Sequence, residues 1–272
     1  MKDLSKIEQK QLRHLFHERK ERLRQEVDVE LEDEIAEVPE GLPLREPIIR
    51  QIDSGVTQLV IVASLVSPAL VPADLDRFLI IAQLEDLDPL ICINKVDLLP
   101  QRAEAEKIMR AYRKLGCQVI LTSAITGEGI SSLRDGLEQK RSLLAGPSGA
   151  GKSALIKRID PNCDQKVETL AISLNTSTSE PANGTMKNYD LARATELIEV
   201  ENLSFLDHFT LPHDEVRFYF SEFQAPSKEC DDNACLHLHE RDCAIKQGVQ
   251  DGTISKLRYE SYRQIVTSLR QR

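Results

Sequence analysis

The chain lacks the hydrophobic segments that carry proteins to or across membranes. Among its 272 residues, no apolar run is long enough to span a bilayer. Residues 1–6, which read Met-Lys-Asp-Leu-Ser-Lys, also lack the apolar core of a secretory signal peptide. We therefore expect a cytoplasmic protein without a membrane partner, or a protein of an organelle stroma whose transit peptide is absent.

The chain also has no excess of positive charge. The chain holds 35 Lys and Arg residues against 44 Asp and Glu residues, which gives a net charge of −9. This charge disfavours a free-standing nucleic-acid binder that relies on an overall positive field, but it leaves docking through a local basic patch open. The hydrophobic content of 41% and the charged content of 29% are typical of a soluble globular protein. A length of 272 residues is enough for one large core plus smaller appendages.

Charge is concentrated in two blocks near the amino end. Residues 5–24 are basic and favour a helix, and residues 26–40 then hold eight acidic residues and no basic one. We interpret the blocks as a solvated helix and an acidic linker, so that residues 1–48 form a helical and acidic extension. The alternative is a basic arm that contacts RNA and is held back by the acidic segment.

From residue 56 onward, strand-like and helix-like segments alternate. Residues 56–65 form a continuous apolar run rich in Val and Ile, as expected for a central parallel strand that is buried on both faces. Further strands are predicted at 89–93, 118–121 and 142–145, and helices at 73–86, 101–115, 130–138 and 153–159. This alternation predicts an α/β fold with a doubly wound, mostly parallel sheet.

The alternating pattern weakens after residue 160. Residues 172–190 are rich in Ser, Thr and Asn and contain Pro181 and Gly184, which favours a loop. Residues 191–209 fit a helix or a strand equally well. The last predicted element is a helix at 251–271, where apolar residues recur at helical spacing.

A complete phosphate-loop motif occupies residues 146–153, which read Gly-Pro-Ser-Gly-Ala-Gly-Lys-Ser. Its glycines permit a tight turn whose N–H groups surround a phosphate, and the following helix directs its positive end at the same anion. Lys152 would pair with the β- and γ-phosphates, and the Ser153 hydroxyl would ligate Mg²⁺. These two are the candidate catalytic residues. The loop indicates phosphate binding but does not specify a base.

A candidate base-reading tetrad, Asn94-Lys95-Val96-Asp97, follows the strand predicted at 89–93. The Asp97 carboxylate can accept two hydrogen bonds from the N1–H and N2–H₂ groups of guanine, a pair that adenine does not offer. Asn94 can bond guanine N7, and the stem of Lys95 can lie along the ring. The tetrad therefore favours guanine over adenine.

A second base-contacting segment begins with Ser123-Ala124 and continues as Ile-Thr-Gly-Glu-Gly. It is similar to the loop that contacts guanine O6 through a backbone N–H. Both base segments come before the phosphate loop, whereas GTPases usually have the opposite order, so the chain resembles a circularly permuted GTPase. Permutation is permissible because sheet contacts depend on which strands are neighbours, and domain termini often lie close together. The expected nucleotide contacts are Asn94, Lys95, Asp97, Ser123, Ala124, Gly146, Pro147, Ser148, Gly149, Ala150, Gly151, Lys152, Ser153 and Ala154.

The six cysteines fall into two groups. Three are scattered, and we interpret them as small core residues in a reducing compartment: Cys92, Cys117 and Cys163. The others form the pattern Cys230-x4-Cys235-x-His237-x5-Cys243, which places three thiols and an imidazole within fourteen residues. Three sulfurs and one nitrogen match a closed tetrahedral zinc site. His239 is the competing imidazole.

Together these segments resemble the RsgA (YjeQ/YloQ) family of permuted GTPases. The matching residues are Ile93-Asn-Lys-Val-Asp-Leu-Leu99, Ser123-Ala-Ile-Thr-Gly-Glu-Gly129, Leu144 to Ser153, the segment from Cys230 to Cys243, and Arg258-Tyr-Glu-Ser-Tyr262. The resemblance implies a GTPase domain at 49–215, in which 163–215 is an atypical switch region, and a zinc-binding, helical domain at 216–272. It implies GTP hydrolysis stimulated by the small ribosomal subunit, contact with rRNA, and release after hydrolysis. It also favours His237 over His239 as the zinc ligand.

Two features of that family are missing from the chain. Residues 1–48 are too short and too helical to form the family's amino-terminal barrel of the OB type. No Asp has a Gly three residues later, so the Asp-x-x-Gly segment that contacts the Mg²⁺ shell and the γ-phosphate is absent. The threonine of the preceding switch would be Thr176, Thr178 or Thr185.

Three functions are open at this point. The first is GTP hydrolysis in late maturation of the small ribosomal subunit, by a monomer that binds GTP or GDP, Mg²⁺, one structural Zn²⁺, the subunit and its rRNA. The second is a nucleotide-binding ribosomal adaptor that has lost hydrolysis. The third is a nucleotide monophosphate kinase, because the phosphate loop resembles that of guanylate kinases. The strands and the tetrad that come before the loop would then have no role.

Overall fold

The computed structural model describes residues 48–165, 167–174, 182–191, 193–201, 206, 209, 211–230, 232 and 235–271. These residues belong to one compact unit, Glu46–Arg272. The extension predicted at 1–48, apart from its last residue, lies outside the described residues, as do Thr176 and Thr178. Within the described part, no helix has the length and apolar character needed to cross a membrane.

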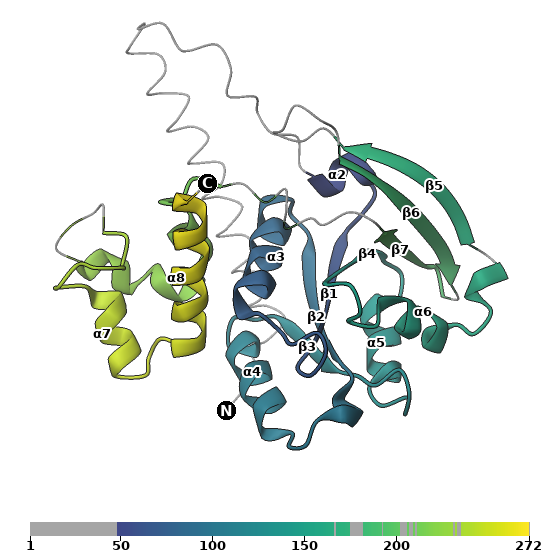
Figure 1. Ribbon diagram of the computed structural model, residues 1–272, viewed down its shortest axis with the longest axis horizontal. Helices are drawn as coiled ribbons and strands as arrows, with labels where there is room; N and C mark the ends of the chain where they lie inside the picture. Colours follow the sequence, from purple (N-terminus) through teal and green to yellow (C-terminus); the bar gives the residue numbers. More distant parts are fainter. Residues whose placement is uncertain are drawn as a thin grey trace, which may run out of the picture. The chain divides into compact units, whose positions relative to one another are not determined.

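A seven-stranded sheet with the order β3-β2-β1-β4-β7-β6-β5 forms the centre of this unit (Figure 1). Its strands are β1 (Gln58–Ser64), β2 (Asp88–Asn94), β3 (Gln118–Leu121), β4 (Arg141–Ala145), β5 (Val167–Leu174), β6 (Ala182–Leu191) and β7 (Thr195–Glu201). Neighbouring strands from β3 to β7 are parallel, whereas β6 runs antiparallel to β7 and β5 antiparallel to β6. The predicted mostly parallel sheet is confirmed.

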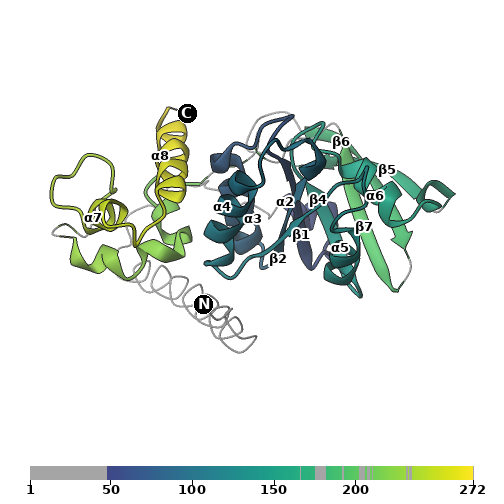
Figure 2. The same ribbon diagram turned by 90° about the horizontal axis from the view of Figure 1, so that it is seen from below.

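Helices cover both faces of the parallel part of the sheet. They are α3 (Pro72–Leu84) and α4 (Ala103–Arg113) on one side, and α5 (Ile130–Leu137) and α6 (Lys152–Ile159) on the other (Figure 1, Figure 2). In the wholly buried β1, Leu59 and Ile61 pack with the first pair, and Val60 and Val62 pack with the second. Both faces of β1 are therefore apolar because both meet a helical layer.

The elements predicted between residues 56 and 159 are all present, but the loop predicted at 172–190 is wrong. The end of β5 and nearly all of β6 occupy that range, and residues 175–181 between them lie outside the described residues. Gly184 pairs with Ile172 in an antiparallel ladder. Met186 and Tyr189 are buried beside β7. Strand pairing at the sheet edge outweighs the polar local composition.

The predicted carboxy-terminal helix is present as α8 (Lys256–Arg270). It follows α7 (Ala244–Gln250) and three short 3-10 turns at Val216–Tyr219, Ser221–Phe223 and Pro226–Glu229. Helix α8 packs against α3 through the buried side chain of Arg258, which is paired with Asp76 and with Glu222. The guanidinium also lies 4.2 Å from the ring centre of Phe220. The elements after residue 215 are thus held to the sheet domain by a buried cation.

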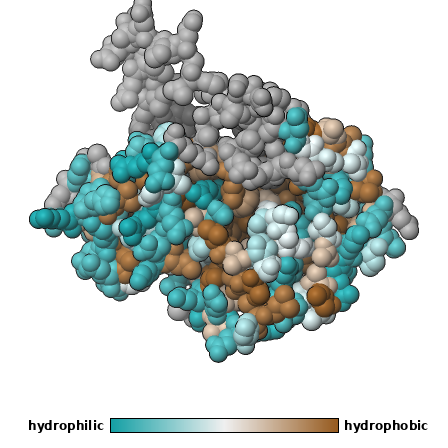
Figure 3. Space-filling view, in the orientation of Figure 1, coloured by the Kyte–Doolittle hydropathy of each residue, from teal (hydrophilic) through white to brown (hydrophobic). Residues whose placement is uncertain are grey.

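Figure 3 shows one face of the molecule, on which hydrophilic residues cover most of the surface and hydrophobic residues gather in the lower middle of the view. Large hydrophobic side chains that are exposed include Val66, Leu98 and Ile125, which lie after the carboxyl ends of β1, β2 and β3. The most exposed of these is Ile125, at 79%. Apolar surface therefore borders the edge of the sheet at which the predicted base segments begin.

Candidate functional site

The phosphate-loop motif connects β4 to α6, as the sequence predicts for a strand–loop–helix unit. Gly146 and Gly151 have φ angles of 135° and 100°, which L-residues with side chains rarely adopt. A Cβ atom on Gly146 would lie 2.1 Å from the carbonyl oxygen of Val62 on β1. The loop therefore packs closely against the neighbouring strand β1. Helix α6 begins at Lys152, so the N–H groups of its first turn lie at the end of the loop.

Lys152 folds back over the phosphate loop. Its ammonium group donates hydrogen bonds to the carbonyl oxygens of Gly146, at 2.9 Å, and Pro147, at 3.3 Å. Burial lowers the pKa of Lys152 from its ordinary value, and the negative charges of Glu199 and Glu201 oppose that shift. The ammonium is thus placed to meet an anion held by the loop.

Ser153 donates a hydrogen bond from its Oγ to Oε1 of Glu199, at 2.8 Å. Glu199 lies in β7 and is 2% exposed, and its Oε2 accepts a 3.3 Å hydrogen bond from the Tyr189 hydroxyl. Neither Glu199 nor Tyr189 was predicted as a site residue. The signal in the sequence was the charged residue at 199 inside the apolar run Leu-Ile-Glu-Val.

Asn94 brings the base tetrad into contact with the phosphate loop. Its Nδ2 donates to the carbonyl oxygen of Ala150 at 3.0 Å, and its Oδ1 accepts from Thr122 Oγ1 at 3.2 Å. Lys95 adopts the left-handed conformation, with φ of 64°, and its ammonium donates to the carbonyl oxygen of Ser67. Asp97 is exposed in the turn that follows. Thr122 is a supporting residue that the motif alone does not reveal.

The Ser123-Ala124 segment follows β3, the neighbour of β2 in the sheet. Ser123 is fully buried, and its Oγ accepts a hydrogen bond from the N–H of Thr126. Arg102, directly before α4, pairs with both carboxylate oxygens of Glu128 at 2.6 and 2.7 Å. The segment is thereby held as a compact turn at the edge of the sheet that also carries Asn94.

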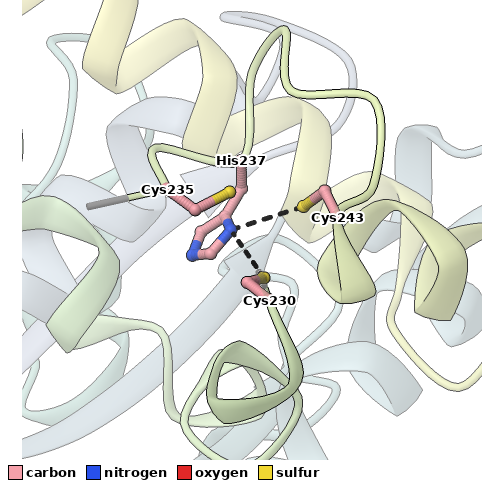
Figure 4. Close-up of side chains that lie close together, drawn as sticks. All are labelled: Cys230, Cys235, His237 and Cys243. Atoms are coloured by element: carbon pink, nitrogen blue, oxygen red, sulfur yellow. Dashed lines mark hydrogen bonds between the residues drawn. The ribbon is translucent and has the colours of Figure 1, made fainter. Parts of the chain in front are cut away.

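The structure brings Cys230, Cys235, His237 and Cys243 together in one buried cluster (Figure 4). Their potential ligand atoms lie within 4.8 Å of one another. Nδ1 of His237 is 3.4 Å from the Cys243 sulfur and 3.8 Å from that of Cys230. His239, by contrast, is exposed.

Surrounding groups hold the imidazole and its loop in place. Burial lowers the pKa of His237 to about 4, so the ring is neutral and keeps a lone pair for a metal ion. The Tyr259 hydroxyl donates to the His237 carbonyl oxygen at 2.8 Å. The Glu240 carboxylate accepts hydrogen bonds from the N–H groups of Leu236, Leu238 and His239. All three belong to the loop that runs from Cys235 to Cys243. Three thiols and one neutral imidazole are a donor set that suits Zn²⁺.

The other cysteines lie away from this cluster. Cys92 and Cys163 are buried, and Cys117 is half-buried. Burial raises the pKa of the Cys92 thiol to about 12, which suppresses the reactive thiolate. This agrees with their interpretation as small core residues.

Comparison with known proteins gives matches over most of the chain. The family model described as RsgA GTPase matches residues 42–181. A curated relative from Caldanaerobacter subterraneus, named small ribosomal subunit biogenesis GTPase RsgA, is 33% identical over 233 residues, which cover 86% of this chain and 78% of the relative. A relative of the same name from Bacillus cytotoxicus is 32% identical over 238 residues, with coverage of 84% and 78%.

Two solved structures share the fold. The crystal structure of YjeQ from Thermotoga maritima aligns with a TM-score of 0.64 and 27% identity, over 80% of this chain and 72% of that one. YloQ, described as a circularly permuted GTPase, aligns with a TM-score of 0.56 and 28% identity, over 80% and 69%. The strand order and the contact between the tetrad and the phosphate loop agree with these matches. The family model and the curated relatives show that the chain belongs to the RsgA GTPase family.

Proposed function

We propose that this chain binds GTP and hydrolyses it to GDP during late maturation of the small ribosomal subunit. The observation that carries the proposal is the hydrogen bond from Asn94 to Ala150, which joins the base tetrad and the phosphate loop into one site despite their reversed order. The names of the curated relatives, small ribosomal subunit biogenesis GTPase, support the same activity and target.

The nucleotide would lie along the carboxyl edge of the parallel strands. The phosphates would receive backbone contacts from the loop and the start of α6, at Gly146, Pro147, Ser148, Gly149, Ala150, Gly151 and Ala154. Lys152 would neutralise the β- and γ-phosphates, and Asp97 would read the guanine edge. The main chain at Ser123 and Ala124 would contact the base oxygen. The exposed apolar side chains of Leu98 and Ile125 are consistent with a site that encloses a flat base.

Two metal ions fit this assignment. Ser153 presents a hydroxyl at the start of α6, where a nucleotide-bound Mg²⁺ would take one protein oxygen. Mg²⁺ supplies charge neutralisation of the phosphates. Cys230, Cys235, His237 and Cys243 would hold one structural Zn²⁺, because their donor atoms are buried, close together and of the right chemical type.

The proposal extends to the organisation of the chain. Residues 49–215 would form the GTPase domain and residues 216–272 the zinc domain that contacts rRNA, in a monomer of the cytoplasm or an organelle stroma. The buried Arg258, paired with Asp76 and Glu222, would then attach the second domain to the first.

A second candidate function is a nucleotide-dependent adaptor that binds the small subunit without hydrolysis. The absence of Asp-x-x-Gly from the sequence favours it. It shares the nucleotide site with the first candidate and differs only in turnover, so a binding experiment alone cannot distinguish the two.

Co-sedimentation with purified small ribosomal subunits tests the proposed target. The chain should pellet with the subunits in a non-hydrolysable GTP analogue and remain in the supernatant with GDP. Lys152→Ala should show no difference between the two nucleotides, because it removes the phosphate-binding ammonium. Equal sedimentation of the unmodified chain in both nucleotides would contradict a nucleotide-controlled interaction.

A further inference from the structure

A buried carboxylate lies directly beside the phosphate loop. Glu199 is in the middle of β7, opposite Leu144 of β4 in the parallel register, and is 2% exposed. Its neighbours along the strand, Ile198 and Val200, are also buried. Burying a carboxylate costs free energy unless hydrogen bonds compensate it, so its contacts indicate what it does there.

Both oxygens of this carboxylate accept hydrogen bonds. Oε1 receives the hydroxyl proton of Ser153, at 2.8 Å, and Oε2 receives that of Tyr189, at 3.3 Å. Glu199 is therefore connected to the first turn of α6 on one side and to β6 on the other. This arrangement orients the Ser153 hydroxyl, whose torsion would otherwise be free.

The orientation matters because a hydroxyl binds a cation through an oxygen lone pair. When the proton is donated to a carboxylate, the lone pairs are left for the cation, and the nearby negative charge strengthens the interaction. We propose that Glu199 is the positioning residue that directs the Ser153 oxygen toward nucleotide-bound Mg²⁺, in place of the carboxylate that an Asp-x-x-Gly segment supplies. This inference rests on the proposed nucleotide-binding function.

Glu201 is the competing carboxylate, since it is two residues further along the same strand and on the same face. It forms an ion pair with Lys187 at 2.7 Å, and its side chain is 39% exposed. Glu199, not Glu201, makes the contact with Ser153. The structure thus distinguishes the two acids by their partners.

The test measures affinity for a fluorescent GDP analogue, by equilibrium titration, in excess Mg²⁺ and in excess EDTA. Glu199→Gln should weaken binding roughly tenfold in Mg²⁺, the size of one charge-assisted hydrogen bond, and leave affinity in EDTA unchanged. Glu199→Asp keeps the charge but is too short to reach Ser153, and should show the same loss. Glu196→Gln, at the amino end of β7 where Glu196 pairs with Arg141, is the matched control and should behave like the unmodified chain.

A double-mutant cycle separates positioning from a merely structural effect. If Glu199 acts through Ser153, then adding Glu199→Gln to Ser153→Ala should cause no further loss of Mg²⁺-dependent affinity. Additive losses, a normal Mg²⁺ dependence in Glu199→Gln, or a loss confined to Glu201→Gln would overturn the inference while leaving nucleotide binding intact. Failure of the unmodified chain to bind the analogue in either buffer would overturn both the inference and the proposed function.

Discussion

The side-chain amide of Asn94 donates a hydrogen bond to the carbonyl oxygen of Ala150, 56 residues later in the chain. The contact joins the base tetrad to the phosphate loop, and it depends on the adjacency of β2, β1 and β4 in the sheet. The contact does not depend on the order of these strands along the chain. A permuted chain can therefore bring the tetrad and the phosphate loop together at one edge of the sheet.

Gly151→Ala should disrupt this contact. A Cβ atom there would lie 2.4 Å from Asn94 Nδ2, and the φ angle of 100° is unfavourable for alanine. We expect GDP affinity to fall roughly tenfold or more, measured by equilibrium titration. Gly116→Ala is the control, because Gly116 also has a positive φ but, among the described residues beyond its chain neighbours, no atom within 4 Å of its Cβ position. It should lose stability by about 1–2 kcal/mol and keep its affinity. Equal affinity losses in the two variants would contradict the account.

Asp97→Asn should change the base preference. The asparagine amide can still accept from guanine N1–H, but its NH₂ group faces the guanine amine, donor to donor. Xanthine has a carbonyl oxygen at that position. GTP affinity should drop roughly a hundredfold while xanthosine triphosphate gains affinity, measured by competition against the labelled analogue. Asp86→Asn, in an exposed turn, should leave both affinities unchanged. Undiminished GTP binding by Asp97→Asn would show that Asp97 does not read the base.

The zinc ion proposed for the cluster of Cys230, Cys235, His237 and Cys243 should stabilise the region after residue 215. Elemental analysis should find one zinc per chain, and Cys243→Ala should abolish it, because the site would keep three of its four donors. Chelation by 1,10-phenanthroline should lower the thermal unfolding midpoint of the unmodified chain. Cys117→Ala, which changes a cysteine outside the cluster, should retain one zinc. Stoichiometric zinc in Cys243→Ala would exclude the assigned ligand set.

Arg258→Met should destabilise the chain strongly. The substitution leaves the Asp76 carboxylate, which is 1% exposed, without its guanidinium partner, and breaking a buried pair in this way costs about 3–5 kcal/mol. Arg263→Met, in the same helix, removes an exposed pair with Glu260 and should cost less than about 1 kcal/mol. Urea unfolding followed by circular dichroism compares the two. Similar losses would mean that the buried pair does not anchor α8.

The sequence predicted those parts of the fold whose signal is local. The apolar run of β1 and the strand–loop–helix around Lys152 appear in the structure where the pattern indicated them. The antiparallel pair of β5 and β6 was missed because β6 is mostly polar and is stabilised by pairing with its neighbours, not by its own composition. Helix α7 has only seven residues, too few for a clear helical period.

In the candidate site, too, only the residues that belong to local motifs were predictable from the sequence. The motifs supplied Asn94 and Ser153, since their spacing is characteristic. Glu199 belongs to no motif, and its relation to Ser153 arises only from the parallel pairing of β7 with β4. A residue whose role is defined by a distant strand cannot be found from its own neighbours in the sequence.

GTP turnover by the purified chain, measured as phosphate release with and without small ribosomal subunits, tests the central claim most directly. We predict hydrolysis that the subunits stimulate and that Lys152→Ala abolishes. Binding of GTP without phosphate release in either condition would contradict the account and identify the chain as a nucleotide-dependent adaptor.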